Sequence, residues 1–318
     1  MSEIGDAITG QIDRLLNDGN GPTRLRRLEA GEWLAETWTA LEEQGLTLAL
    51  VPEDAGGVGL SWADAVAIWQ VLGRHGAPVP VAEAMLANAL LASPVEGVLT
   101  LGASDAPFGR FAAHAVTEAG VRPVTGHTPG LNLAREPRDA LRLGASLTAG
   151  GPSPRAMRLG LALLRAAQMA GAARHALNLA VEWANTRKQF GRPIGKFQAI
   201  QQSLALVAGE VAALESAVGI AARAVDARGL LDAGFEIACA KIIAGEAAEL
   251  AASRVHQVFA AIGITEEHEL HHFTRRLWSW RDEGGSERAW AAEIGAEAIS
   301  RGGAALWADI TSRDVRTA

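Results

Sequence analysis

The feature that most constrains this chain is the stretch spanning residues 185–204. Apolar residues repeat at helical spacing on both sides of it, ending in Ala184 on one side and starting from Phe197 on the other. Gly191 tolerates unusual backbone angles and Pro193 cannot donate a helical hydrogen bond, so the first helix is expected to end there. The stretch therefore predicts two long helices joined by a tight turn.

The turn carries Arg187, Gln189 and Phe190 at the exposed end of the first predicted helix. A guanidinium can hold an anion there while the aromatic ring lies beside it. The ordinary alternative is a solvated helix end with a buried phenylalanine. Local spacing alone favours this alternative, because most charged helix ends are of that kind.

A longer stretch of sequence around the turn favours a binding role over a solvated helix end. Residues 187–194, Arg-Lys-Gln-Phe-Gly-Arg-Pro-Ile, followed by residues 197–201, Phe-Gln-Ala-Ile-Gln, resemble the C-terminal helical domain of acyl-CoA dehydrogenases. A second string, Gly-Ile-Thr-Glu-Glu-His after Gln257, resembles the same family. The resemblance implies that this region reaches across a dimer interface to the FAD of a neighbouring subunit. The implied cofactor-binding residues are Arg187, Gln189, Phe190, Phe197, Gln198, Gln257 and Ser286.

Residues 1–92 read as an N-terminal helical domain that resembles the family more loosely. Ser61 is expected to cap a helix there, after a glycine-rich loop. That loop lacks the Lys and Ser/Thr of a phosphate-binding loop, so it is not expected to bind phosphate.

Residues 93–152 predict a reduced β domain, with β-leaning pieces at 97–101 and 114–117 between turn residues. The family places a complete β domain here to cover the flavin. This segment has room for only about half of it, judged by strands of about 5–6 residues. Its flavin-contacting loops and Trp have no recognisable counterpart, so the chain is not expected to bind FAD alone.

Residues 153–318 predict a C-terminal four-helix bundle, and the fold class is mainly α. The expected helices run from Pro154 to Ala184, from Gly195 onward, from Leu231 to Phe259, and from about Ser286 to Leu306 or Trp307.

The family reaction needs one glutamate to remove the α-proton of an acyl-CoA. The string that resembles the family's usual base location is residues 283–286, Glu-Gly-Gly-Ser, and it places Gly284 at the base position. A second family location falls near Leu161, which is not acidic either. Asp282 and Glu283 remain weak candidates. Their ordinary interpretation is as carboxylates stabilised by the dipole of the following helix.

His268, His271 and His272 share one helical face, which makes a metal site conceivable. No zinc-type cysteine pairing or His-Glu-x-x-His string accompanies them, and no metal site is expected.

Composition narrows the class of protein. The net charge of −7 gives no basic field for nucleic acid. Cys239 is the only cysteine, which excludes an intrachain disulfide and favours a reducing cytoplasm. The first residues lack the pattern of a signal peptide. No apolar run is expected to approach the ~18 residues that span a membrane.

The combined expectation is the small, catalytically silent subunit of a heteromeric acyl-CoA dehydrogenase, of the α2β2 type that the resemblance links to actinobacterial steroid breakdown. FAD would lie between this chain and a full-length partner that carries the base. Electron-transferring flavoprotein is the expected acceptor. Two alternatives stay open: a self-sufficient flavoenzyme that uses Glu283 or Asp282, and a non-enzymatic helical interaction protein.

Overall fold

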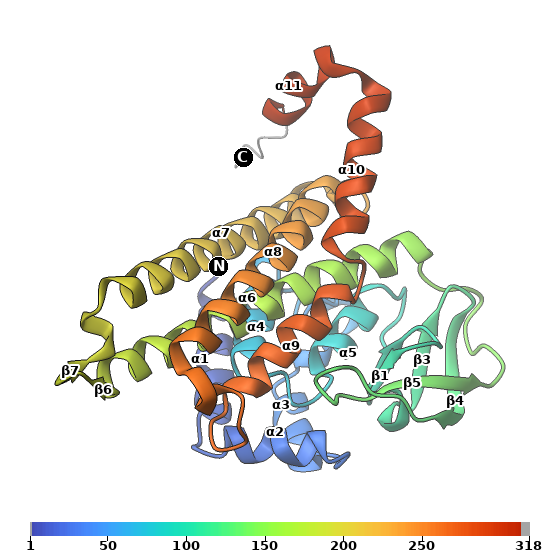
Figure 1. Ribbon diagram of the computed structural model, residues 1–318. Helices are drawn as coiled ribbons and strands as arrows, with labels where there is room; N and C mark the ends of the chain where they lie inside the picture. The colour runs from blue at the N-terminus through green and yellow to red at the C-terminus, as the bar shows by residue number, and fades with distance from the viewer. Residues whose placement is uncertain (1, 313–318) are drawn as a thin grey trace.

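The computed structural model describes residues 2–312, and Figure 1 shows helices at both ends of the chain with a small sheet between them. The prediction of a mainly α fold with helical parts on both sides of a short β segment is confirmed. The N-terminal helices are α1 (Glu3–Leu16), α2 (Gly21–Glu29), α3 (Ala35–Glu42), α4 (Trp62–Arg74) and α5 (Val81–Ala89).

Helix α4 ties the N-terminal helices to the rest of the molecule. Ser61 caps it as predicted, since its hydroxyl accepts a hydrogen bond from the backbone N–H of Asp64 at 3.1 Å. The carboxylate of Asp226, far away in sequence, accepts the next two free N–H groups, those of Trp62 and Ala63. All three bonds satisfy donors that have no partner inside the helix.

The sheet has five strands in the order β1-β3-β4-β5-β2. Strand β1 is parallel to β3, and the other pairs are antiparallel. The two β-leaning pieces of the sequence become β1 and β3, whereas β2, β4 and β5 were not predicted. The strands are β1 (Leu99–Leu101), β2 (Ala106–Pro107), β3 (His114–Thr117), β4 (Gly120–Thr128) and β5 (Arg138–Leu143).

The C-terminal part is a bundle in which α6, α7, α8 and α9 pack together. Ser153 caps α6, and Pro154 occupies its first turn, where a missing N–H costs nothing. The helices are α6 (Pro154–Thr186), α7 (Gln198–Arg228), α8 (Gly234–Phe259), α9 (Leu270–Asp282), α10 (Glu287–Arg301) and α11 (Gly303–Thr311).

Two glycines let α4 lie directly against α6. A Cβ at Gly73 would stand 2.1 Å from the carbonyl oxygen of Gln168, and a Cβ at Gly171 would stand 1.9 Å from that of Gln70. Only glycine permits backbones this close, so the N-terminal helices and the bundle share one continuous core.

The first long helix ends at Thr186, two residues beyond the predicted Ala184, and its expected stop signals Gly191 and Pro193 lie in a two-stranded hairpin over residues 188–193. Two other helix predictions need correction. The fourth bundle helix is α9, which was not predicted as a bundle helix and was expected to belong to the connection before the last helix. The predicted last helix is broken at Gly302, which has a φ of 81°, and α10 carries α11 away from the bundle (Figure 1).

Helix α7 qualifies the expectation that no apolar run approaches the length of a membrane span. It contains an 18-residue window of mean hydropathy 1.7, which is long and apolar enough by composition to cross a membrane. In the structure, 28% of that window is buried. Alternating Ala and Gly with Val, Leu and Ile gives this value without an obvious apolar run. Leu206 and Ile220 on this helix are 52% and 47% exposed.

Candidate functional site

The segment that follows α6 turns back on itself at once. Strands β6 (Lys188–Gln189) and β7 (Arg192–Pro193) are antiparallel. Phe190 and Gly191 between them have φ values of 50° and 79°, the pattern of a type I′ hairpin turn. The turn holds the Phe190 side chain out into solvent, where it is 90% exposed.

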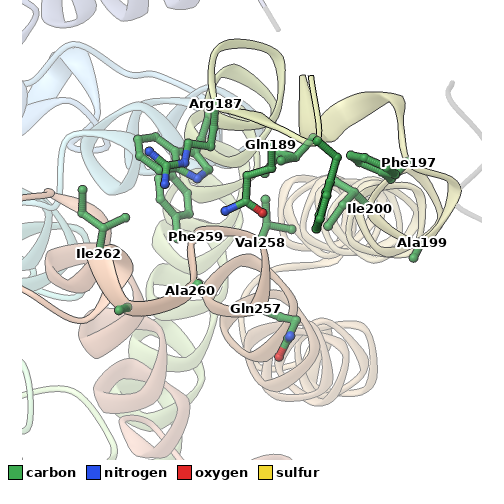
Figure 2. A pocket seen from close by; sticks show the side chains of 14 residues that line it. Arg187, Gln189, Phe197, Ala199, Ile200, Gln257, Val258, Phe259, Ala260 and Ile262 are labelled. Atoms are coloured by element: carbon green, nitrogen blue, oxygen red, sulfur yellow. The ribbon is translucent and has the colours of Figure 1, made fainter. Parts of the chain in front are cut away.

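This hairpin forms one wall of a pocket of about 580 Å³. Figure 2 shows Arg187 and Gln189 on the hairpin side, with residues 257–260 on the opposite side. The lining residues come from the end of α6, the hairpin, the start of α7, the end of α8 and the short helix η5 (Ala260–Gly263): Trp183, Arg187, Gln189, Phe190, Ile194, Phe197, Ala199, Ile200, Gln257, Val258, Phe259, Ala260, Ala261 and Ile262.

The pocket combines a free cation with flat apolar surface. Among the described residues, no carboxylate forms an ion pair with Arg187, whose guanidinium lies 5.9 Å from the centre of the Trp183 ring. Trp183 stacks on Phe259, with ring centres 5.2 Å apart. An unpaired guanidinium beside an aromatic stack suits an anion attached to a planar ring.

The structure brings together five of the seven predicted cofactor residues: Arg187, Gln189, Phe190, Phe197 and Gln257. The other two do not line the pocket. Gln198 is the first residue of α7, and the Ser286 hydroxyl instead accepts a hydrogen bond from the N–H of Ala289 at the start of α10.

The sequence reading missed Trp183 and Phe259. Trp183 precedes Arg187 by four residues, and that helical spacing was a usable signal. Phe259 gave no such signal, because its partner across the pocket lies far away in the chain.

Glu283 lies in a different place, between the sheet and the bundle. Its carboxylate accepts hydrogen bonds from Arg138 Nε at 2.8 Å, Arg165 Nε at 2.6 Å and Asn132 Nδ2 at 3.2 Å. Burial alone would raise the pKa of Glu283, but the charges of Arg138 and Arg165 outweigh it and lower the pKa to about 2. Such a carboxylate is a poor proton acceptor near neutral pH. Its neighbour Asp282 is the last residue of α9.

The network extends beyond Glu283. Arg165 also pairs with Glu83 at 2.8 Å, and both side chains are 1% exposed. Arg138 also pairs with Glu136 at 3.0 Å. Side chains of α5, the β4–β5 connection, β5 and α6 therefore meet Glu283 in one network of ion pairs.

The two positions that the family resemblance links to a catalytic base touch each other. A Cβ at Gly284 would stand 2.8 Å from the backbone nitrogen of Ala162 and 3.1 Å from the carbonyl carbon of Leu161. Gly284 has a φ of 73°, which disfavours any other residue. No side chain fits between the loop and α6 without a backbone shift.

The three histidines that share a helical face in the sequence do not converge. His268 packs on Phe259, with ring centres 4.4 Å apart. His271 and His272 instead lie near Glu29, with possible ligand atoms within 4.8 Å of one another. Glu29 already pairs with Arg275 and Arg276, and these cations oppose a metal ion at that place.

Family comparisons cover both helical parts of the chain. The model described as acyl-CoA dehydrogenase, C-terminal domain, matches residues 157–299. The model described as acyl-CoA dehydrogenase, N-terminal domain, matches residues 7–100.

Similar curated proteins include the acyl-CoA dehydrogenase IpdE2 of Mycobacterium tuberculosis, which is 32% identical over 277 residues, covering 80% of this chain and 85% of the relative. IpdE2 of Mycolicibacterium smegmatis is 29% identical over 300 residues, covering 87% of this chain and 93% of the relative.

Solved structures share the fold. The ChsE4–ChsE5 complex of Mycobacterium tuberculosis gives a TM-score of 0.79 at 22% identity, covering 93% of this chain and 97% of the matched chain. A glutaryl-coenzyme A dehydrogenase bound to glutaryl-CoA gives 0.80 at 19% identity, covering 94% and 96%. A steroid acyl-CoA dehydrogenase, Tcur3481–Tcur3483, gives 0.79 at 24% identity, covering 95% and 99%.

Proposed function

This chain belongs to the acyl-CoA dehydrogenase family, and from that premise we propose that it is the non-catalytic subunit of a heteromeric acyl-CoA dehydrogenase. Enzymes of this family are oxidoreductases that act on CH–CH bonds, and FAD is their cofactor. When bound, FAD accepts the hydride. In the proposed complex, the partner subunit seats the flavin ring and carries the base.

The pocket around Arg187 carries the proposal. It offers an unpaired guanidinium, the amide of Gln189 and the Trp183–Phe259 stack, all in an open hollow of about 580 Å³. These groups suit the pyrophosphate and adenosine part of a flavin nucleotide. Arg187 and Gln189 would hold the nucleotide, while the proton and hydride chemistry takes place on the partner.

The region around Glu283 supports the non-catalytic role. Arg138 and Arg165 hold the Glu283 carboxylate, and Gly284 lies against the backbone of α6. A self-sufficient enzyme needs a base of suitable pKa with space for an acyl chain beside it. The charged network and the Gly284 contact oppose both requirements, so this alternative is disfavoured.

The substrate class and the assembly are part of the proposal. Two similar structures are described as a ChsE4–ChsE5 complex and as a steroid acyl-CoA dehydrogenase of two components. We extend this to a steroid-derived CoA ester as substrate and to an α2β2 assembly with a full-length partner. We further propose an electron-transferring flavoprotein as the electron acceptor.

The experiment compares two neighbouring residues in the purified complex with the partner. Arg187→Ala removes a charge-assisted hydrogen bond worth about 1.5–3 kcal/mol, so FAD affinity should fall at least tenfold. Lys188→Ala is the matched control, because Lys188 is exposed in the same hairpin but does not line the pocket. Flavin fluorescence follows FAD dissociation, and circular dichroism checks the fold.

Gln189→Ala should act in the same direction and more weakly, because its hydrogen bond is neutral on one side. Unchanged FAD affinity in a folded Arg187→Ala complex, or equal losses in the Arg187 and Lys188 variants, would contradict the shared-flavin proposal.

A further inference from the structure

A second hollow, of about 510 Å³, is lined by residues of α8, of α9 and of the connection between them, and it is distinct from the Arg187 pocket. Consecutive residues of α8 separate the two, because Gln257 lines the first and His256 lines the second. Its size is within the ~300–1,000 Å³ of small-molecule sites. The proposed function makes no use of this hollow.

Its aromatic wall is Trp278, which is 37% exposed. The indole lies nearly parallel to the imidazole of His256, with an interplanar angle of 14° and ring centres 6.0 Å apart. His256 in turn contacts the hydroxyl of Thr274 at 2.9 Å, which fixes the imidazole. The indole is therefore held in one orientation while part of it remains open to a ligand.

Among the described lining residues, the charged side chain without a partner is a carboxylate, that of Glu266, whereas Arg275 Nε is a donor without a partner. Among the described residues, Glu266 and Ser253 are exposed lining residues whose side chains form no ion pair or hydrogen bond. His271 Nδ1 lies 2.8 Å from the carbonyl oxygen of His268 and donates to it. Burial lowers the pKa of His271, which favours the neutral ring. In that neutral ring Nε2 carries the lone pair. The one cationic residue in this lining, Arg275, already pairs with Glu29.

A carboxylate, a neutral imidazole, a hydroxyl and an indole face together favour a ligand that is rich in donors and positively charged. A cation is attracted by both the carboxylate and the ring quadrupole, and an apolar stem can cover the indole edge. We propose that this hollow binds an amphipathic organic cation, an alkyl guanidinium or alkyl amine. Two sources share this chemistry: a free molecule, or an Arg or Lys side chain of the partner subunit.

The test titrates agmatine, an alkyl guanidinium with an amine, into the full chain and into the complex, by calorimetry. Glu266→Gln should weaken binding about tenfold or more, because it removes the charge that the cation meets. Glu267→Gln is the matched control, being exposed next to Glu266 but outside the lining. Indole-3-acetate, a flat anion, should not bind.

Saturable binding of agmatine to both the chain and the complex supports a free cation as the ligand. Binding to the chain alone supports a side chain of the partner that fills the hollow in the complex. Absence of saturable binding to either, or an equal loss in the Glu266 and Glu267 variants, overturns the proposal. Trp278→Leu, checked for folding by its melting temperature, should weaken binding while Glu266 remains in place.

Discussion

Glu283 is surrounded by positive charge and serves the fold. Replacing it with glutamine leaves Arg138 and Arg165 short of a buried counter-charge, which should cost about 3–5 kcal/mol of stability. Turnover per folded complex should stay nearly unchanged, whereas loss of a true general base costs roughly 10²–10⁴-fold. Steady-state kinetics of the Glu283→Gln complex, with FAD content measured, tests this expectation.

The acid stability of the chain provides the companion measurement. The pKa of Glu283 lies near 2, below its usual value of 4.5, so its contribution to stability is present above pH 4.5 and is lost as pH falls toward 2. The Glu283→Gln chain should lose that part of the pH dependence of stability.

For the kinetic measurement, a large drop in turnover of the Glu283→Gln complex with FAD retained would assign the base to this chain.

Gly284 permits the contact between its loop and α6. Gly284→Ala places a methyl group 2.8 Å from the backbone of Ala162 in a left-handed conformation, and should cost about 2–4 kcal/mol. Gly295→Ala on α10 is the control, since a Cβ there meets nothing within 4 Å and should stabilise the helix by about 0.5–1 kcal/mol. Urea denaturation measures both. Equal stability of the two variants would show that the loop has room to spare.

The site residues divide into those that the sequence could predict and those that it could not. Arg187, Gln189 and Phe190 lie in one short motif, so their proximity follows from the chain itself. The Glu283 network depends on Arg138 and Arg165, which are 145 and 118 residues away from it. No local pattern indicates such a partner, and Glu283 therefore looked like a weak candidate base.

The helices and strands likewise divide into those that the sequence could predict and those that it could not. The long helices α6, α7 and α8 were predicted because their apolar spacing is regular over many turns. The β6–β7 hairpin was not, since two-residue strands carry no periodicity, and only the Phe190-Gly191 turn identifies it in hindsight. Strand β4 was missed because Pro123 and two glycines mask its pattern.

The end of α8 contains a strained residue. Ala260, at the floor of the Arg187 pocket, has φ 56° and ψ −139°, a region that is nearly reserved for glycine. Ala260→Gly should therefore raise the free energy of unfolding by about 1 kcal/mol. Ala261→Gly, one residue further in a regular helical turn, should lower it by about 0.5–1 kcal/mol. Thermal and urea denaturation compare the two, and a destabilising Ala260→Gly would mean that the Ala260 methyl group contributes packing that outweighs its strain.

At the scale of the whole molecule, the proposal that FAD is shared with a partner subunit predicts how the isolated chain binds FAD. The isolated protein should fold without retaining flavin, because the Arg187 pocket is open on the side that the partner would cover. Incubation with excess FAD, followed by gel filtration and an absorbance scan, should find far less than one FAD per chain. The same scan on the co-expressed complex is the control and should show the flavin bands.

One FAD per chain in the isolated protein, stable to gel filtration, would contradict the proposal. The fold would then seat a flavin without help, and the Arg187 pocket would need another ligand.

The exposed side of α7 has a consequence for how the cell must make this protein. Helix α7 is as apolar in composition as a membrane span, and it exposes Leu206 and Ile220, so copies of this chain made without a partner are at risk of aggregation. Copies made in excess would be subject to chaperone binding, proteolysis or aggregation. If the proposed partner covers that surface, the synthesis of this chain should match that of the partner in both timing and amount.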